Sequence, residues 1–352
     1  MQRRLLQPGA LDRGKTLSVT CSICIANYNG IGLIDECLAS IRAQTVDFPI
    51  EIIVHDDASS DCSVEHLRKN HPEVHLIESE TNVGFCVANN RMAAVARGEY
   101  LLLLNNDAAL FPDALSTLMH EADRLGRFAI LSLPQHDTES GALLDIGSLL
   151  DPFLNPVPNL DSSRNEVAMV MGACLWIPKT LWNELGGFPE WFGSIAEDLY
   201  LCCRARLAGY GVRALSHSGY YHRVGSSFGG GKTRNGRLAT TFRRRALSER
   251  NKTFVIVMTY PAPVLQFLLP LHLALLLVES VLLTVLHRRL TYLTQVCLPL
   301  FRELVRKREL LLSVRKDVMG NRSIGVNKFF SRFSLLPHKL RMFLRFGLPR
   351  VD

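Results

Sequence analysis

Between residues 17 and 109, short apolar runs alternate with longer stretches in which apolar residues recur every three to four positions. This alternation is typical of βαβ units, which build a parallel sheet between layers of helices. The run 101–104 consists only of leucine, as expected of a strand that is covered on both faces. The pattern predicts strands at 18–26, 50–55, 74–78 and 100–104, and helices at 34–44, 63–70 and 85–97.

The pattern is less regular after residue 109, where a segment rich in Pro, Asp, Ser and Gly at 134–166 indicates loops or a short insertion. Around that segment, helices are predicted at 112–125, from residue 178 and at about 197–209, and apolar stretches at 128–133 and 167–177. The predicted fold class is therefore α/β, with a mostly parallel sheet flanked by helices and a C-terminal helical region.

The C-terminal region contains a long apolar segment at 254–286, which is interrupted by Pro261, Pro263 and Pro270. Its longest proline-free piece has about 16 residues, whereas a helix needs about 20 apolar residues to span a bilayer. We therefore expect helices that lie in the membrane interface or insert shallowly. The alternatives are a true span, or a helical appendage that packs on the domain or forms a dimer.

The net charge of +7 is concentrated near the C-terminus, because residues 288–352 contain fifteen Lys and Arg against four Asp and Glu. These basic residues accompany apolar runs, which favours an anionic membrane surface as partner and disfavours nucleic acid. Residues 1–16 lack the apolar stretch of a secretory signal, and several of the nine cysteines fall within apolar runs. We therefore expect a location at the cytoplasmic face of the inner membrane.

Three acidic sites follow predicted strands or begin a predicted helix. Asp56 and Asp57 come directly after the strand at 50–55, where carboxylates can accept hydrogen bonds from a nucleotide base and from ribose hydroxyls. Asp107 follows the leucine strand, and a carboxylate there can hold Mg²⁺ or Mn²⁺ together with phosphate oxygens. Plain helix or turn capping is the alternative role at both sites.

The third acidic site is the pair Glu197-Asp198 at the start of a predicted helix. A carboxylate in a cleft can take the proton from an acceptor hydroxyl while that hydroxyl attacks an electrophilic carbon. Acidic residues also favour helix N-termini for electrostatic reasons alone. We expect one residue of the pair to serve only that purpose.

These three sites, together with the segment Asn82-Val83-Gly84-Phe85, resemble the family 2 glycosyltransferases of the GT-A fold, particularly their bacterial rhamnosyltransferase-like branch. The resemblance covers roughly residues 18 to 250, about two thirds of the chain, in the order in which the family has these elements. It implies a nucleotide site formed by Asn27, Tyr28, Asn29, Asp56, Asp57, Asn82, Gly84 and Asn106.

The resemblance also implies roles for the remaining site residues. Asp107 would be the ligand of a Mg²⁺ or Mn²⁺ ion, and His222, in the stretch 222–227, would complete the metal shell or touch phosphate. A surface histidine is the alternative for His222. Asp198 would be the acceptor base, and Glu197 would support it or face the acceptor. The metal motif lacks its first aspartate, and Ala58 replaces the usual small residue, but neither departure removes a catalytic atom.

The implied reaction is an inverting transfer of a sugar from a nucleotide-diphosphate donor, such as dTDP-rhamnose or a UDP-hexose. The acceptor would be a glycan or lipid-linked hydroxyl in cell-surface polysaccharide synthesis. A catalytically inactive membrane-bound scaffold and a nucleotidyltransferase are the alternatives, although the latter would need a Gly-rich basic first loop. A nicotinamide dehydrogenase is excluded because no G-x-G-x-x-G follows the first strand.

The predicted organisation has three parts: a tail at 1–16, a catalytic domain at 17–250 and a membrane-association region at 251–352. Within the catalytic domain, the glycine-rich segment 229–232 lacks the spacing of an ATPase phosphate loop. We expect it to form a mobile lid over the donor.

Overall fold

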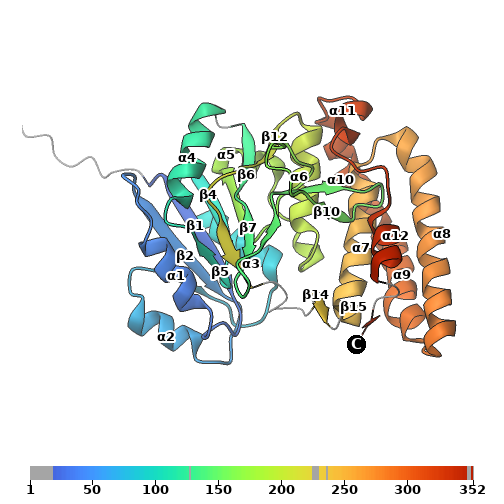
Figure 1. The fold of residues 1–352 in the computed structure, drawn as a ribbon, viewed down its shortest axis with the longest axis horizontal. Helices are drawn as coiled ribbons and strands as arrows, with labels where there is room; N and C mark the ends of the chain where they lie inside the picture. The colour runs from blue at the N-terminus through green and yellow to red at the C-terminus, as the bar shows by residue number, and fades with distance from the viewer. Residues whose placement is uncertain (1–18, 127, 224–229, 235–236, 347–349, 352) are drawn as a thin grey trace, which may run out of the picture.

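The computed structural model describes residues 19–126, 128–223, 230–234, 237–346 and 350–351. The predicted tail at 1–16 lies outside this part of the chain. So do residues 224–227 of the stretch that begins at His222 and residue 229 of the glycine-rich segment predicted as a lid. Figure 1 shows a sheet with flanking helices, coloured blue to green, beside a group of helices coloured orange to red.

The centre of the molecule is a seven-stranded sheet in the order β12-β6-β11-β4-β1-β2-β3. Strands β4, β1, β2 and β3 run parallel, as do β6 and β12, while β11 is antiparallel to both of its neighbours. The predicted α/β class with a mostly parallel sheet is confirmed. The strands are β1 (Cys21–Asn27), β2 (Ile50–Asp56), β3 (His75–Glu78), β4 (Tyr100–Asn105), β6 (Ala129–Ser132), β11 (Cys174–Pro178) and β12 (Gly211–Ala214).

Helices cover both faces of this sheet, and the leucine run of β4 lies between them. Leu101 and Leu103 belong to the core under one face, whereas Leu102 and Leu104 belong to the core under the other. This confirms the prediction of a strand buried on both sides. The helices of this part are α1 (Ile34–Arg42), α2 (Ser63–Asn70), α3 (Phe85–Val95), α4 (Ala114–Arg124), α5 (Lys179–Leu185) and α6 (Glu197–Leu207).

The segment at 134–166, predicted to form loops or a short insertion, contains four strands of three residues each. Strands of this length are too short to show a clear alternation of apolar and polar residues. A four-stranded sheet has the order β5-β13-β7-β8, and β9 pairs with β10. These strands are β5 (Ala108–Leu110), β7 (Gln135–Asp137), β8 (Leu143–Asp145), β9 (Ser148–Leu150), β10 (Pro156–Pro158) and β13 (Tyr220–His222).

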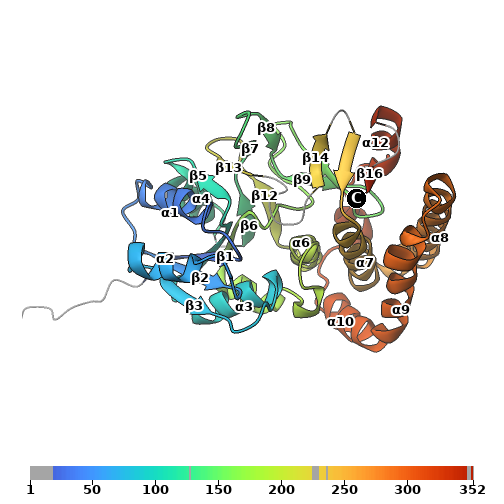
Figure 2. The same ribbon diagram turned by 90° about the horizontal axis from the view of Figure 1, so that it is seen from below.

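A group of helices follows, and its first member extends the core of the sheet domain. Helix α7 runs through residue 250, the predicted domain boundary, and Phe254, Ile256 and Met258 pack in the same core as α3 and α6. Figure 2 shows α6 between the sheet and α7. The elements are α7 (Phe242–Thr259), α8 (Ala262–His287), η2 (Tyr292–Cys297), α9 (Leu298–Arg306), α10 (Arg308–Gly320), α11 (Val326–Phe330) and α12 (His338–Phe346), with η1 (Glu190–Phe192) before α6 and the small sheet of β14 (Gly230–Arg234), β15 (Arg237–Thr240) and β16 (Arg350–Val351).

Helix α8 corrects the prediction that prolines divide the segment 254–286 into pieces too short to span a membrane. Pro261 and Pro263 lie at its start, where proline is tolerated, and Pro270 lies inside the helix without ending it. The resulting helix has 26 residues and is long and apolar enough to cross a membrane, judged by length and composition.

Candidate active site

A cleft of approximately 370 Å³ lies at the carboxyl end of β4 and is bounded by α6 and α7. Five of the predicted site residues line it together, although they come from three distant parts of the chain. The carboxyl ends of parallel strands are where α/β sheets bind ligands. The predicted residues in the cleft are Asn106, Asp107, Glu197, Asp198 and His222.

Asp107 and His222 are brought together by the pairing of β5 with β13, in which His222 lies opposite Ala108. The Nε2 atom of His222 is 3.2 Å from Oδ1 of Asp107, and the two side chains are 11% and 3% exposed. Two adjacent ligands of an octahedral cation with bonds of about 2.1 Å lie about 3 Å apart. The separation and the carboxylate and imidazole donors therefore fit a shared Mg²⁺ or Mn²⁺ ion.

Glu197 and Asp198 begin α6, directly after two residues with left-handed backbone conformations, Ile195 and Ala196. Non-glycine residues rarely adopt that conformation, so the loop is held in a strained geometry that sets the entry of the helix. The Asp198 carboxylate accepts hydrogen bonds from the backbone N–H groups of Gly172 at 3.0 Å and Leu199 at 2.7 Å. Asp198 is thus fixed in position at the wall of the cleft.

The acidic pair titrates unusually because both groups are removed from water. Burial, together with the charge of Asp198, raises the pKa of Glu197 to about 8. Burial also raises the pKa of Asp198, although hydrogen bonds from the backbone N–H groups of Gly172 and Leu199 oppose this shift. Because an aspartate has the lower ordinary pKa and Asp198 accepts these two bonds, we assign the negative charge of the pair to Asp198 and the proton to Glu197 near neutral pH.

A chain of hydrogen bonds leads from the cleft to the first acidic site. Asn106 Nδ2 donates to Asn27 Oδ1 at 2.8 Å, and Asn27 Nδ2 donates to Asp56 Oδ2 at 2.9 Å. Asp56 also accepts from the hydroxyl of Ser59 at 2.7 Å. Gly30 lies against this chain, where a Cβ atom would come within 2.2 Å of Asn106 and Asn27. Any larger residue at position 30 would therefore separate Asn106 from Asn27 and Asp56.

The remaining predicted nucleotide residues do not line the cleft that contains Asp107 and Asp198. Asp57 accepts the N–H groups of Val83 at 2.6 Å and Gly84 at 2.9 Å, and so it fixes the turn that leads into α3. Asn82 donates to the backbone carbonyl of Asp57 at 3.3 Å. The contacts of Asp57, Asn82 and Gly84 with a nucleotide stay predictions.

The first loop is tied to the loop after β2. The Oδ1 atom of Asn29 accepts from the N–H of Ser60 at 2.8 Å, and the N–H of Asn29 donates to the hydroxyl of Ser59. Tyr28 is 54% exposed and is available to stack on a planar ligand. Ala58 has a φ of 62°, which explains why glycine is the usual residue type in such a position.

Several residues of the cleft were not predicted from the sequence. Helix α7 contributes Arg244, Ser248 and Lys252, whose spacing of four places them on one face of the helix. This spacing was visible in the sequence, but nothing in it indicated that the face lines the cleft. The other unpredicted residues include Phe85, Leu154, Pro156, Met169 and Met171, which supply an apolar wall.

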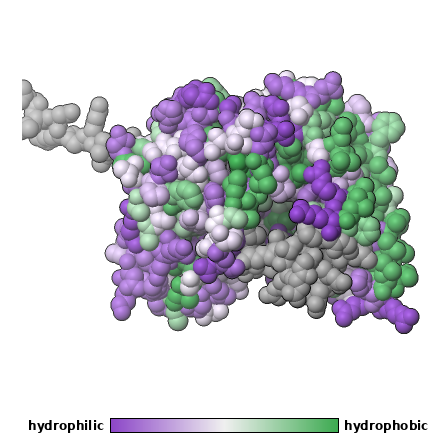
Figure 3. Space-filling model, viewed as in Figure 1, coloured by the Kyte–Doolittle hydropathy of each residue, from purple (hydrophilic) through white to green (hydrophobic). Residues whose placement is uncertain are grey.

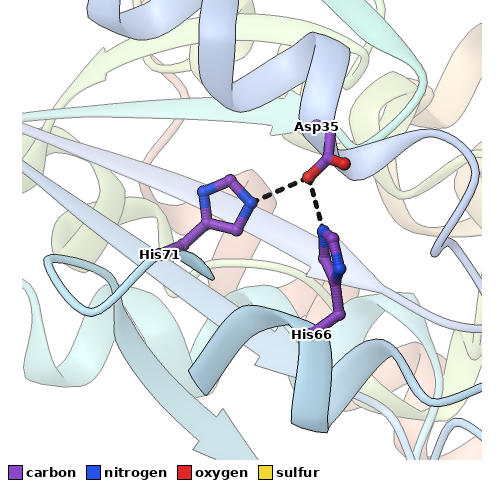
Figure 4. Close-up of side chains that lie close together, drawn as sticks. All are labelled: Asp35, His66 and His71. Carbon is purple, nitrogen blue, oxygen red and sulfur yellow. Dashed lines mark hydrogen bonds and ion pairs between the residues drawn. The ribbon is translucent and has the colours of Figure 1, made fainter. Parts of the chain in front are cut away.

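A second cluster of ligand-type side chains lies between α1 and α2, where Asp35 faces His66 and His71 (Figure 4). The Asp35 Oδ1 atom is 2.7 Å from Nε2 of His66 and 2.8 Å from Nε2 of His71. Arg42 contacts Nδ1 of His71, and a guanidinium only donates hydrogen bonds. Nδ1 of His71 must therefore accept, which leaves the proton on Nε2. The cluster is consequently a hydrogen-bonded link between two helices rather than a metal centre.

The fold and the acidic residues at the edge of its sheet define a protein of the GT-A class. The structure of GalNAc-T7 with UDP, GalNAc and Mn²⁺ superposes with a TM-score of 0.55 at 14% identity, over 70% of this chain and 48% of that one. Residues 22–171 match the model of glycosyl transferase family 2, and residues 100–303 match that of glycosyl transferase family group 2. The chain belongs to glycosyltransferase family 2.

Two curated relatives illustrate the range of this similarity. The chain is 27% identical over 247 residues to the uncharacterized protein y4gI of Sinorhizobium fredii, which covers 68% of this chain and 26% of that protein. It is 24% identical over 207 residues to the N-acetylglucosaminyl-diphospho-decaprenol L-rhamnosyltransferase of Mycobacterium tuberculosis, covering 50% of this chain and 67% of that enzyme. The chain thus matches about a quarter of the first relative and about two thirds of the second.

Proposed function

We propose that this chain is an inverting, metal-dependent glycosyltransferase that moves a sugar from a nucleotide-diphosphate donor to a hydroxyl of a glycan or lipid-linked acceptor. One observation carries the proposal: Asp107 with His222 and Glu197 with Asp198 line the same cleft, although they come from distant parts of the chain. A cation-binding pair and a proton-accepting pair are the two functions that such a transfer requires.

The chemistry follows from the positions of the acidic pair. Asp198 accepts the proton of the acceptor hydroxyl, and the oxygen forms a bond to the anomeric carbon while the bond to the diphosphate breaks. Attack from the face opposite the leaving group inverts the configuration at that carbon. Glu197, which keeps its proton near neutral pH, limits the negative charge next to Asp198. No covalent intermediate with the enzyme is required.

Asp107 and His222 would hold the Mg²⁺ or Mn²⁺ ion, which when bound neutralises charge on the leaving diphosphate. The GalNAc-T7 structure, which contains UDP and Mn²⁺, supports this assignment by analogy of fold. Asn105 donates from Nδ2 to Nε2 of His222 at 3.3 Å, and a cation bound at Nε2 would replace this hydrogen bond.

The donor and the acceptor are proposed from the relatives. The mycobacterial relative is named for transfer of L-rhamnose to an N-acetylglucosaminyl diphosphate carried on decaprenol. We therefore propose dTDP-rhamnose or a UDP-hexose as donor and a sugar on a polyprenyl diphosphate as acceptor, in the synthesis of a cell-surface polysaccharide. Tyr28, Asn29, Asp56 and Asp57 are proposed to contact the nucleotide.

Membrane attachment is the second part of the proposal and depends on α8. Its outward face carries large apolar side chains, with Phe267 80% exposed and Val285 68% exposed. Figure 3 shows hydrophobic atoms gathered along the margin of the molecule where α8 lies in Figure 1. An apolar face of this length is unfavourable in water, which supports an apolar environment against it. The other exposed residues of the face include Leu271, Leu275, Val278, Leu282 and Leu286.

The inward face of α8 mixes polar and apolar side chains, since His272 and Ser280 are buried there beside Leu276 and Leu283. His272 shares a hydrogen bond with Thr253 of α7 at 2.8 Å. Glu279 forms ion pairs with Arg245 at 2.7 Å and with Lys339 at 2.9 Å. Because these contacts hold α8 lengthwise against α7 and α12, we propose that α8 lies along the bilayer interface and inserts its outer face shallowly.

The charges around α8 support an anionic leaflet as the surface. Arg288 and Arg289 are exposed directly after the apolar face, and Arg302, Arg306 and Arg308 follow on α9 and α10. Each such charge contributes about 1 kcal/mol near an anionic membrane. We propose the cytoplasmic face of the inner membrane as the location and the region 251–352 as the attachment segment, which places the cleft beside lipid-linked acceptors.

The function is tested by screening nucleotide sugars for metal-dependent protection of the full chain against thermal unfolding, followed by transfer to lipid extracts. We expect one nucleotide to raise Tm only when Mn²⁺ or Mg²⁺ is present. Absence of protection by any nucleotide sugar, together with absence of transfer, would favour the inactive scaffold.

Attachment is tested by Val278→Asp with Val285→Asp, which place carboxylates on the outer face of α8. We expect co-sedimentation with vesicles containing phosphatidylglycerol to fall at least tenfold. Leu160→Asp is the control, because Leu160 is 61% exposed on the sheet domain and lies outside the α8 face. Unchanged sedimentation of the double variant would refute attachment through α8.

A further inference from the structure

Arg244 is the one cationic side chain of the cleft that lacks a partner within the described residues. It lies in the first turn of α7, where its backbone N–H donates to the Thr241 hydroxyl at 3.2 Å, and its guanidinium makes no hydrogen bond or ion pair there. Burial lowers the pKa of Arg244, and no neighbouring carboxylate counteracts that shift. A partly buried guanidinium without an anion is unfavourable, because it loses water without gaining a partner.

The other cations of α7 are satisfied. Arg245 pairs with Glu279 at 2.7 Å, and Arg250 donates to the carbonyl oxygen of Phe192 at 2.8 Å. Lys252, which also lines the cleft, pairs with Glu249 at 3.3 Å and donates to Asn155 Oδ1 at 2.6 Å. The missing partner of Arg244 is therefore specific to that position on the helix rather than a property of the whole segment.

The acids of the cleft do not supply this partner. Asp198 is engaged by two backbone N–H groups, and Asp107 lies beside His222. Arg244 is absent from the interactions that set the pKa values of Glu197 and Asp198. The cleft thus offers a positive site that is separate from its proposed cation site and from its acidic pair.

We propose that Arg244 binds a phosphate group of a substrate within the cleft. The planar guanidinium can donate two parallel hydrogen bonds to a phosphate, and these are among the strongest polar contacts in proteins. This inference rests on the proposed function, since it assumes that substrates carrying diphosphates enter the cleft. It deepens that function by assigning a residue to anion recognition.

The phosphate has two possible sources: the diphosphate of the nucleotide donor and the diphosphate that links the acceptor sugar to its lipid. The position of Arg244 favours the acceptor. Helix α7 lies next to the C-terminal helices, whereas β5, which directly follows Asp107, lies across α6 in Figures 1 and 2. The apolar wall of Leu154 and Pro156 is on the α7 side, because Lys252 contacts the adjoining Asn155.

The test compares Arg244→Gln and Arg244→Lys with the parent chain in detergent micelles. Arg243→Gln is the matched control, because it removes the same charge from the adjacent, exposed position of α7. Binding is measured calorimetrically for three probes: inorganic pyrophosphate, UDP or dTDP with Mn²⁺, and an N-acetylglucosaminyl diphosphate on a short prenol. Thermal unfolding of each variant checks that it is folded.

We expect Arg244→Gln to lower the affinity for the prenol-linked diphosphate and for pyrophosphate by about 10- to 100-fold. Its affinity for the nucleotide should stay within about twofold of that of the parent chain. Arg244→Lys should restore part of the loss, and Arg243→Gln should bind like the parent. A lower affinity for the nucleotide alone would support phosphate binding by Arg244, with the diphosphate of the donor as the group that is bound. Equal binding of all three probes by the parent and Arg244→Gln would overturn the proposal.

Failure of the proposed function gives a different result. If the chain transfers no sugar but binds pyrophosphate through Arg244, the phosphate site is supported and the transferase activity is contradicted. If Arg244→Gln transfers sugar normally, with an unchanged KM for the acceptor, the transferase activity is supported and the phosphate site is contradicted.

Discussion

The cleft and the C-terminal helices both bury carboxylates, but the pKa values of these carboxylates shift in opposite directions. In the cleft, burial raises the pKa of Glu197 to about 8 and raises that of Asp198, since no cation pairs with them. Among the helices, burial also raises the pKa of Glu249, but Lys252, Lys339 and Arg245 outweigh it and lower that pKa well below the ordinary value. Lys339 Nζ lies 2.7 Å from Glu249.

The difference indicates different purposes. Paired charges such as Glu249 and Lys339 are compensated within the protein, so they join α7, α8 and α12 and leave no charge for a ligand. Unpaired acids such as Asp198 cost stability and are retained where they can accept a proton. The same contrast separates Arg245, which is paired, from Arg244, which is not.

The largest expected effect concerns the acidic pair. Asp198→Asn removes the proposed proton acceptor and should lower the transfer rate about 1000-fold, because general-base catalysis contributes about 10² to 10⁴. The Gly172 and Leu199 N–H groups bond to different oxygens of the Asp198 carboxylate, so the amide oxygen of the variant keeps one of these bonds. Asp107 and His222 are unchanged, so donor binding should be kept. Initial transfer rates and nucleotide Kd measure the two effects. A normal rate would show that another group takes the proton.

Asp107→Ala removes the carboxylate of the proposed cation pair. Nucleotide binding in the presence of Mn²⁺ should weaken about 100-fold, whereas binding without metal should change little. Asp123→Ala, at an exposed position of α4, is the control. Calorimetric titration of UDP and dTDP with and without Mn²⁺ gives the result, and equal metal dependence in both variants would contradict the assignment.

Lys339→Met tests the compensated side of the comparison. It leaves Glu249 and Glu279 with fewer cations while the helices stay packed. Because the Lys339 side chain is 42% exposed and its charge is partly screened by water, the free energy of unfolding should fall by about 1 to 2 kcal/mol. Lys316→Met, at an exposed position of α10, should change it by less than about 0.5 kcal/mol. Denaturant titration compares the two variants, and equal stabilities would show that the ion pairs contribute little.

Glu197→Gln tests the uncompensated side through pH. Because the pKa of Glu197 is higher in the folded than in the unfolded chain, the folded state binds more protons and loses stability as pH rises from about 4.5 toward about 8. The variant should therefore be more stable than the parent at pH 8, by about 1 to 3 kcal/mol, and nearly equal at pH 4.5. Thermal unfolding across this range measures the difference, and parallel curves would contradict the raised pKa.

Much of the fold could be predicted because its signals are local. The leucines of β4 alternate between two cores, α2 occupies the predicted residues 63–70, and the parallel order of β1, β2 and β3 follows from short helical connections. The strands at 134–166 could not be predicted, since each has only three residues, and β7 depends on a distant partner, β13 at residues 220–222. The length of α8 could not be predicted, because the surrounding packing decides whether a helix continues through an internal proline such as Pro270.

The sequence by itself determined the residue types of the site, including Asp107, Asp198 and His222, because strand ends and helix starts mark such positions. Only the tertiary structure decided that these three share a cleft, that Asp57 holds the turn before α3, and that Arg244 faces the same cavity. Periodicity tells which residues of a helix lie on one face but not what that face meets. The inner and outer faces of α8 likewise became distinguishable only when the surrounding helices were in place.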